Sequence, residues 1–141
     1  MRKQSEIIDV LAEVPLFSRC SKRDLQALAR RIDVLSFEEG QTIVRQGGVG
    51  NAFYVLLDGF AAVRRSGRRV GRLGPGEYFG ELALLDPGPR NADIEALSPV
   101  TVARLVARDF NEVLHAVPAI SERLLAGLAR RLREEDRRSV Q

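Results

Sequence analysis

Residues 52–80, AFYVLLDGFAAVRRSGRRVGRLGPGEYFG, decide the fold that the sequence predicts. Two β-rich runs lie within this stretch, at 52–65 and 68–74. Glycine-containing pairs and triplets, the residues that tight turns need, punctuate the runs at 58–59, 66–67 and 74–76. Short strands that alternate with tight turns are typical of a small antiparallel barrel or roll.

The same character extends outward in both directions. Further β-rich runs lie at 33–37, 41–46 and 100–107, and ten of the 12 glycines lie in 40–80. No amphipathic segment of helical length separates these runs, so a parallel sheet with crossover helices is not expected. The sequence therefore predicts a β-roll over 33–107.

Helical patterns flank the predicted roll. Apolar spacing predicts one helix over 5–13 and a second over 21–31, which opens with a capping box at Ser21. After the roll, Asp109 is a candidate N-cap for a short helix, and Pro118 fits the first turn of a longer one. We therefore expect one α+β domain over 1–141: N-terminal helices at 1–32, the roll, and C-terminal helices at 108–141.

The composition excludes several kinds of active site. The chain has 141 residues, with a single cysteine, Cys20, and a single histidine, His115. These numbers exclude a disulfide framework and a zinc site built from cysteine and histidine, and they disfavour catalysis by either residue. A metal-dependent β-barrel enzyme needs several histidine ligands. We therefore expect no enzyme, no metal and no catalytic residue.

Charge and hydropathy point to a cytoplasmic protein. No apolar run approaches the roughly 20 residues of a membrane helix, and the N-terminal residues lack an apolar signal core. The formal net charge is +3, with 20 arginines against 2 lysines, a ratio that suits anion binding or a GC-rich, bacterial genome. Four arginines near 64–69 lack interleaved aromatic residues, which favours a solvated hairpin over a nucleic-acid surface.

Residues 76–92, GEYFGELALLDPGPRNA, carry the chemistry. Gly80 allows a ligand to approach the backbone closely, and backbone N–H groups near Leu82 can point at phosphate oxygens. Arg90 adds a charge-assisted, bidentate contact. Glu81 is unusual beside an anion, unless it accepts hydrogen bonds from a sugar hydroxyl. This pattern indicates a compact binding site for an anion.

The stretch resembles the phosphate-binding cassette of cyclic nucleotide-binding domains, over 79–92. Phe79 to Leu85 match its F-G-E-[LI]-A-L-L pattern, and Pro89, Arg90 and Ala92 match the P-R-x-A that follows. The resemblance continues at 15–17 (PLF), 39–47 and 53–59, so that it spans nearly the whole chain. It implies the β-roll of catabolite activators and of regulatory subunits of protein kinase A.

The resemblance also implies a ligand and a role for each residue. The domain would bind cAMP or cGMP without turnover and would need no cofactor besides this ligand. Glu81 would bind the ribose 2′-hydroxyl, and Arg90 would pair with the cyclic phosphate. The phosphate would be lined by the backbone groups of Gly80, Leu82, Asn91 and Ala92. The sugar and the base would lie against the apolar side chains of Val70 and Phe79.

Nucleotide choice stays open at Asn91, where the family often has alanine, threonine or serine. Threonine there tends to favour cGMP, whereas an asparagine side chain both donates and accepts hydrogen bonds and permits either base. Family base rates favour cAMP.

The resemblance makes the C-terminal helix a lid, from which Arg131 or Glu135 would reach the ligand. Its apolar stripe equally suits a homodimer or an effector protein. Because no helix-turn-helix follows it, we expect no DNA binding by this chain itself. Because no apolar run is as long as a membrane helix, we expect no membrane partner. Two alternatives remain: a related fold that has lost its ligand and serves as an interaction scaffold, or the sensor part of a larger transcription regulator, channel or enzyme.

Overall fold

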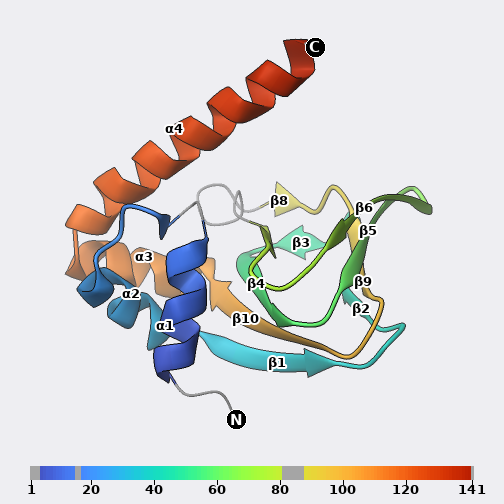
Figure 1. The fold of residues 1–141 in the computed structure, drawn as a ribbon, viewed down its shortest axis with the longest axis horizontal. Coiled ribbons are helices and arrows are strands. Elements are labelled where there is room, and N and C mark those ends of the chain that lie inside the picture. Colours follow the sequence, from blue (N-terminus) through green and yellow to red (C-terminus); the bar gives the residue numbers. More distant parts are fainter. Residues whose placement is uncertain (1–3, 15–16, 81–87, 141) are drawn as a thin grey trace. The chain divides into compact units, whose positions relative to one another are not determined.

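The computed structural model describes residues 4–14, 17–80 and 88–140 (Figure 1). The chain divides into two compact units. One is continuous and spans 31–111, and the other combines the residues up to Arg30 with those from Glu112 onward. The expectation that residues 1–141 form a single domain stays a prediction.

The continuous unit is an antiparallel β-roll, as the sequence predicts (Figure 1). One sheet has the strand order β1-β10-β4-β7, the second has the order β2-β9-β5-β6, and β3 pairs with β8. Every pairing is antiparallel. The strands are β1 (Asp33–Phe37), β2 (Thr42–Val44), β3 (Val49–Gly50), β4 (Ala52–Asp58), β5 (Ala61–Arg65), β6 (Arg68–Leu73), β7 (Tyr78–Phe79), β8 (Gly88–Pro89), β9 (Asp93–Ala96) and β10 (Val100–Val106).

The predicted run at 52–65 is two strands in the structure, β4 and β5. Gly59 separates them with a φ of +89°, and a Cβ atom there would collide with the carbonyl oxygen of Pro99. Only glycine fits this turn, because the residue needs both a left-handed conformation and room for a neighbouring backbone. The turn folds β5 out of the sheet that holds β4 and into the second sheet.

The core of the roll lies between the two sheets. Strand β4 is buried from Ala52 to Leu57, and Leu56 and Val102 are completely buried. Apolar residues from both sheets meet here, and they are Ala52, Tyr54, Leu56, Ala61, Ile94, Ala96, Val100 and Val102, with Phe79 packed against them. Burial of this side-chain set is the main stabilising term, at roughly 25 cal/mol per Å² of apolar surface. This core gives the strands around the predicted cassette a rigid base.

The second unit is helical. It contains α1 (Gln4–Glu13) and α2 (Lys22–Ala29), the end of α3 (Ala107–Ala116), and α4 (Ala119–Val140). The capping box at Ser21 is present: the Asp24 N–H donates to Ser21 Oγ at 3.1 Å, and the Ser21 N–H donates to Asp24 Oδ2 at 3.0 Å. Helix α3 begins two residues before Asp109, so Asp109 lies in its first turn and the predicted N-cap was wrong.

Helix α4 makes one polar contact with the first turn of α2 and another with the loop that precedes α2. Arg123 is paired with the buried Asp24, and Arg130 Nη2 donates to Ser18 Oγ at 2.6 Å. Gly127 lies between these arginines and is buried. Positions 123, 127 and 130 share one face of a helix, whereas Leu125 is turned away from it and is 62% exposed. This unit therefore contains one docked face of α4 and an apolar side chain on another face.

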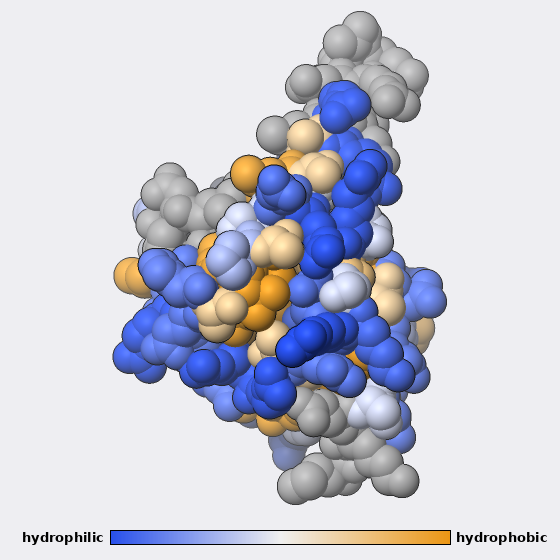
Figure 2. All heavy atoms as spheres, turned by 90° about the vertical axis from the view of Figure 1, so that its left-hand side faces the viewer, coloured by the Kyte–Doolittle hydropathy of each residue, from blue (hydrophilic) through white to orange (hydrophobic). Residues whose placement is uncertain are grey.

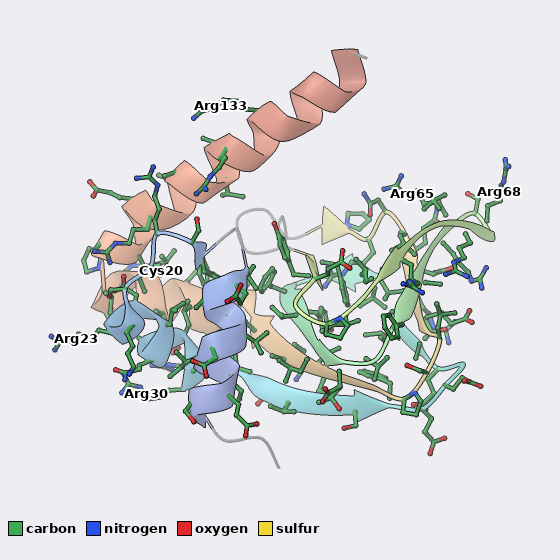
Figure 3. All side chains as sticks on the ribbon, in the orientation of Figure 1. Cys20, Arg23, Arg30, Arg65, Arg68 and Arg133 are labelled. Atoms are coloured by element: carbon green, nitrogen blue, oxygen red, sulfur yellow. The ribbon has the colours of Figure 1, made fainter. Side chains whose placement is uncertain are left out.

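Most charged side chains lie at the surface. Hydrophilic residues cover most of the described surface in Figure 2, and Figure 3 shows Arg23, Arg30 and Arg133 extending from helices and Arg65 and Arg68 at the end of the β5–β6 hairpin. None of the helices, over the residues that the structure describes, is long and apolar enough to cross a membrane.

Candidate functional site

The predicted cassette is described at its two ends. Phe79 ends β7 and Gly80 follows it; Arg90 follows β8, and Asn91 and Ala92 lead into β9. Glu81 and Leu82 lie outside the described residues. The two described ends meet at the side chain of Arg90, around which the site is built.

The backbone of Arg90 is held on both sides. Its N–H donates to the carbonyl oxygen of Gly48 at 2.8 Å, and its own carbonyl accepts from the Gly47 N–H, also at 2.8 Å. These bonds extend the short β3–β8 ladder, in which Val49 pairs with Pro89. Paired backbone groups on both sides leave this residue little conformational freedom. The arginine therefore projects from a fixed point of the roll.

The guanidinium group of Arg90 binds a carbonyl group of the core strand β4. Its Nη2 donates to the carbonyl oxygen of Ala52 at 2.7 Å, and the bond is partly buried. Ala52 itself is 2% exposed. A charged donor on a neutral carbonyl makes a stronger bond than a neutral pair, and such bonds contribute about 1.5–3 kcal/mol. One edge of the guanidinium plane is thus fixed by the backbone.

Two glycines make room for this side chain. Gly80 has a φ of +82°, and a Cβ atom there would lie 2.5 Å from Arg90 Nη1 and 2.6 Å from the Ala52 oxygen. At Gly50, a Cβ atom would lie 2.9 Å from Arg90 Nε and 2.8 Å from the carbonyl oxygen of Gly88. Real Cβ atoms do not approach other atoms this closely, so both positions require glycine for Arg90 to stay in place. Gly80 is a predicted site residue, and the structure puts it against the arginine.

Aromatic rings complete the surroundings of Arg90. Its Cζ atom lies 5.7 Å from the centroid of the Tyr54 ring, within the range of a cation–π contact. Tyr54 in turn stacks on Phe79, with centroids 4.8 Å apart and ring planes 9° apart. The carbonyl of Ala52 and the ring of Tyr54 come from the same strand, and neither was a predicted site residue. The pairing of β4 with β7 places Tyr54 directly opposite Phe79 of the cassette.

The other predicted site residues have different surroundings. Ala92 is 6% exposed, and Asn91 is exposed. Val70 lies on β6 in the second sheet and is 54% exposed, whereas Phe79 belongs to the first sheet. The predicted lid residues, Arg131 and Glu135, belong to α4, but their side chains lie outside the described set. Of the predicted residues, the structure therefore brings together Phe79, Gly80 and Arg90.

Metal binding and thiol chemistry would need side chains other than that of Arg90. Within 4–14, 17–80 and 88–140 there is no cluster of three histidine, cysteine, aspartate or glutamate side chains that would hold a metal ion. Burial, followed by the charge of Asp24, raises the pKa of the Cys20 thiol to about 11, and Arg123 opposes this shift. Because the thiolate is the nucleophilic form, Cys20 is a poor nucleophile at neutral pH.

Comparison with known proteins shows the family of this chain. Residues 34–116 match the model of the cyclic nucleotide-binding domain family. The chain is 37% identical, over 106 residues, to a cAMP-dependent protein kinase regulatory subunit of Schizosaccharomyces pombe. That alignment covers 74% of this chain and 26% of the yeast protein, so the chain spans about a quarter of the length of this relative.

Solved structures show the same fold. The N-terminal domain of a transcriptional regulator from Streptomyces coelicolor superposes with a TM-score of 0.84 at 33% identity, covering 90% of this chain and 94% of that one. The catabolite activator protein of Thermus thermophilus superposes with a TM-score of 0.74 at 33% identity, covering 86% of this chain and 60% of that one. These matches confirm the predicted β-roll with flanking helices. The chain belongs to the cyclic nucleotide-binding domain family.

Proposed function

We propose that this chain binds a cyclic nucleotide as a non-catalytic regulatory module, with cAMP as the favoured ligand and cGMP as the alternative. The observation that carries the proposal is the guanidinium group of Arg90, which the Ala52 carbonyl and two glycines hold in place. A fork held in this way presents directed donors to the oxygens of a cyclic phosphate. The preference for cAMP is supported by the name of one relative, a cAMP-dependent protein kinase regulatory subunit.

The remaining ligand contacts follow from the family pattern. The Glu81 carboxylate accepts a hydrogen bond from the ribose 2′-hydroxyl. Backbone groups at Gly80, Leu82, Asn91 and Ala92 line the phosphate. Phe79 and Val70 are proposed as apolar walls. No residue of this set is proposed to break a bond, because the site is built to hold an anion and the Cys20 thiol is protonated at neutral pH.

Output is proposed to pass through α4. Ligand would bind the lid-closed state more tightly and so shift the population of α4 conformations by its differential affinity. From α4, Arg131 or Glu135 would reach the ligand. The exposure of Leu125, opposite the face that carries Arg123 and Arg130, supports a homodimer or effector contact along this helix.

Calorimetric titration with cAMP and with cGMP tests the binding proposal. We expect saturable heat with at least one nucleotide. Binding must also stabilise the fold against heat, by about 2.7 kcal/mol at 100 times the dissociation constant, since ligand binds only the native state. Absence of both heat and stabilisation at millimolar nucleotide would refute binding and leave the interaction scaffold as the function.

Hydrogen exchange tests the role of α4. Amides over 119–130 are expected to change their protection when the binding nucleotide is added, while those of α1 serve as the internal reference. Binding without any change in α4 would separate recognition from the proposed output.

A further inference from the structure

Two side chains of the cassette, Phe79 and Arg90, form a stack with Tyr54 of β4. The rings of Phe79 and Tyr54 stack with their centroids 4.8 Å apart. The Cζ atom of Arg90 lies 5.7 Å from the centroid of the Tyr54 ring. Tyr54 and Phe79 are directly paired across β4 and β7, so the backbone register fixes how their rings meet. The stack therefore connects the buried strand to the arginine that the proposed ligand needs.

The ring of Tyr54 is well suited to hold a guanidinium group still. Tyr54 is 8% exposed and belongs to the core cluster, so packing restricts its two side-chain torsions. Arginine has several rotatable bonds and loses rotamer entropy when it is immobilised. The Tyr54 ring and the Ala52 carbonyl both hold the guanidinium group of Arg90. The side chain therefore loses this entropy on folding, before any ligand binds.

We propose that Tyr54, supported by Phe79, is a positioning residue that keeps Arg90 oriented to receive the ligand phosphate, an inference that rests on the proposed function. Phe79 then acts through Tyr54, in addition to any contact with the nucleotide itself. Tyr54 contributes to affinity by fixing Arg90 and not by touching the ligand.

The two strands also supply a matched control. Phe53 precedes Tyr54 on β4, is 1% exposed, and contacts Tyr78 of β7 with centroids 5.5 Å apart at 49°. Because side chains alternate along a strand, Phe53 is turned to the opposite face of β4 from Tyr54. Phe53→Leu therefore removes a buried ring from the same strand without removing the ring beside Arg90.

The contact itself is tested without ligand by a double-mutant cycle in urea unfolding. The cycle uses Tyr54→Leu, Arg90→Ala and the double variant. If the ring and the guanidinium interact, the effects on the unfolding constant will differ from additivity by about three- to five-fold, the range of a modest cation–π contact. Additive effects would overturn the proposal.

The positioning role is tested by nucleotide titration. Tyr54→Leu is expected to weaken binding of cAMP, or of cGMP if that nucleotide binds, by about 3- to 30-fold. Tyr54→Phe keeps the ring face and should retain affinity within about two-fold, as should Phe53→Leu. In an Arg90→Ala background, Tyr54→Leu should have no further effect, which a general loss of folding would not produce.

The outcomes separate the two claims. Equal losses from Tyr54→Leu and Phe53→Leu would overturn positioning and leave nucleotide binding standing. An undiminished effect of Tyr54→Leu in the Arg90→Ala background would also overturn it. If the unaltered chain binds neither nucleotide, the proposed function fails, and the role of Tyr54 in binding fails with it.

Discussion

The β3–β8 ladder and the β5–β6 hairpin each present arginines on the same roll, but they hold them differently. Arg90 has both backbone groups paired and its guanidinium against the Ala52 carbonyl. Arg65 and Arg68 face each other across the hairpin and are exposed. Figure 3 shows these two at the end of the hairpin. The same residue type is thus fixed in one region and solvated in the other.

This difference shows that the density of positive charge does not identify the site. Like charges directly opposite each other in a sheet are destabilising, and the hairpin tolerates them because solvent and salt screen exposed charges. Arg90 stands without another arginine nearby in sequence, yet its side chain is enclosed by backbone, glycine and ring. We therefore propose that the contacts that fix its guanidinium group distinguish Arg90, as the binding residue, from surface charge.

The largest expected effect is the weakening of nucleotide binding by Arg90→Ala. Truncation of one partner of a partly buried charged contact costs about 2 kcal/mol or more, which is at least about 30-fold in affinity. Arg68→Ala removes the same charge from the hairpin and should change affinity less than about two-fold at physiological salt. Calorimetric titration measures the affinity of both variants. Equal losses of affinity would mean that the nucleotide responds only to the net charge of the protein and not to the position of Arg90.

Next in size is the effect of an added methyl group at Gly80 on stability. Gly80→Ala and Gly67→Ala both place a side chain at a positive φ, +82° and +81°, which costs about 1–2 kcal/mol. A Cβ at Gly67 meets nothing within 4 Å, whereas at Gly80 it meets Arg90 and Ala52. Urea unfolding should show an additional loss of about 1–3 kcal/mol for Gly80→Ala. Equal stabilities of the two variants would mean that Arg90 moves aside freely.

A smaller contrast is expected between Gly50→Ala on β3 and Gly71→Ala on β6. The Cβ at Gly71 makes an ordinary 3.9 Å contact with Val63, and that at Gly50 lies 2.9 Å from Arg90 Nε. We expect Gly50→Ala to lose about 1–2 kcal/mol of stability, and Gly71→Ala to remain within about 0.5 kcal/mol of the unaltered chain. Urea unfolding measures the stability of both variants. Unchanged stability of Gly50→Ala would mean that Arg90 is not closely packed against residue 50.

The smallest effect belongs to the half-buried ion pair near the turn of the hairpin. Arg64 Nε lies 3.3 Å from Glu95 Oε2, with side chains 31% and 34% exposed. A pair this accessible contributes about 0.2–1 kcal/mol and weakens as salt is added. Glu95→Gln should therefore lower stability slightly at low salt and hardly at all in 1 M salt. A loss of stability that persists in 1 M salt would show that solvent does not screen the Arg64–Glu95 pair, so that the hairpin arginines are less solvated than proposed.

Much of the scaffold was predictable from local patterns. The capping box at Ser21 and the strand Asp33–Phe37 are both present as predicted, because turn chemistry and alternation act over a few residues. Strands β3, β7 and β8 have two residues each, too few for alternation to mark them. These short strands are the ones that build the site.

The site was predictable in its residue types and less so in its assembly. Arg90 and Gly80 stood out because their chemistry matched a family pattern. The contact of Arg90 with Ala52 joins residues 38 positions apart and depends on register, which the sequence does not display locally. Phe79 was expected to face the ligand, a role that stays a prediction beside its observed stacking on Tyr54.

The ion pair between Asp24 and Arg123 has a consequence for the order of synthesis. Its partners are 99 residues apart, and the roll between them is one continuous unit. A ribosome delivers the roll before it delivers Arg123, so the sheets can close while Asp24 still lacks its arginine. The pairing of Asp24 with Arg123 must therefore form after the roll has been synthesised, because the segments of the helical unit are made at different times.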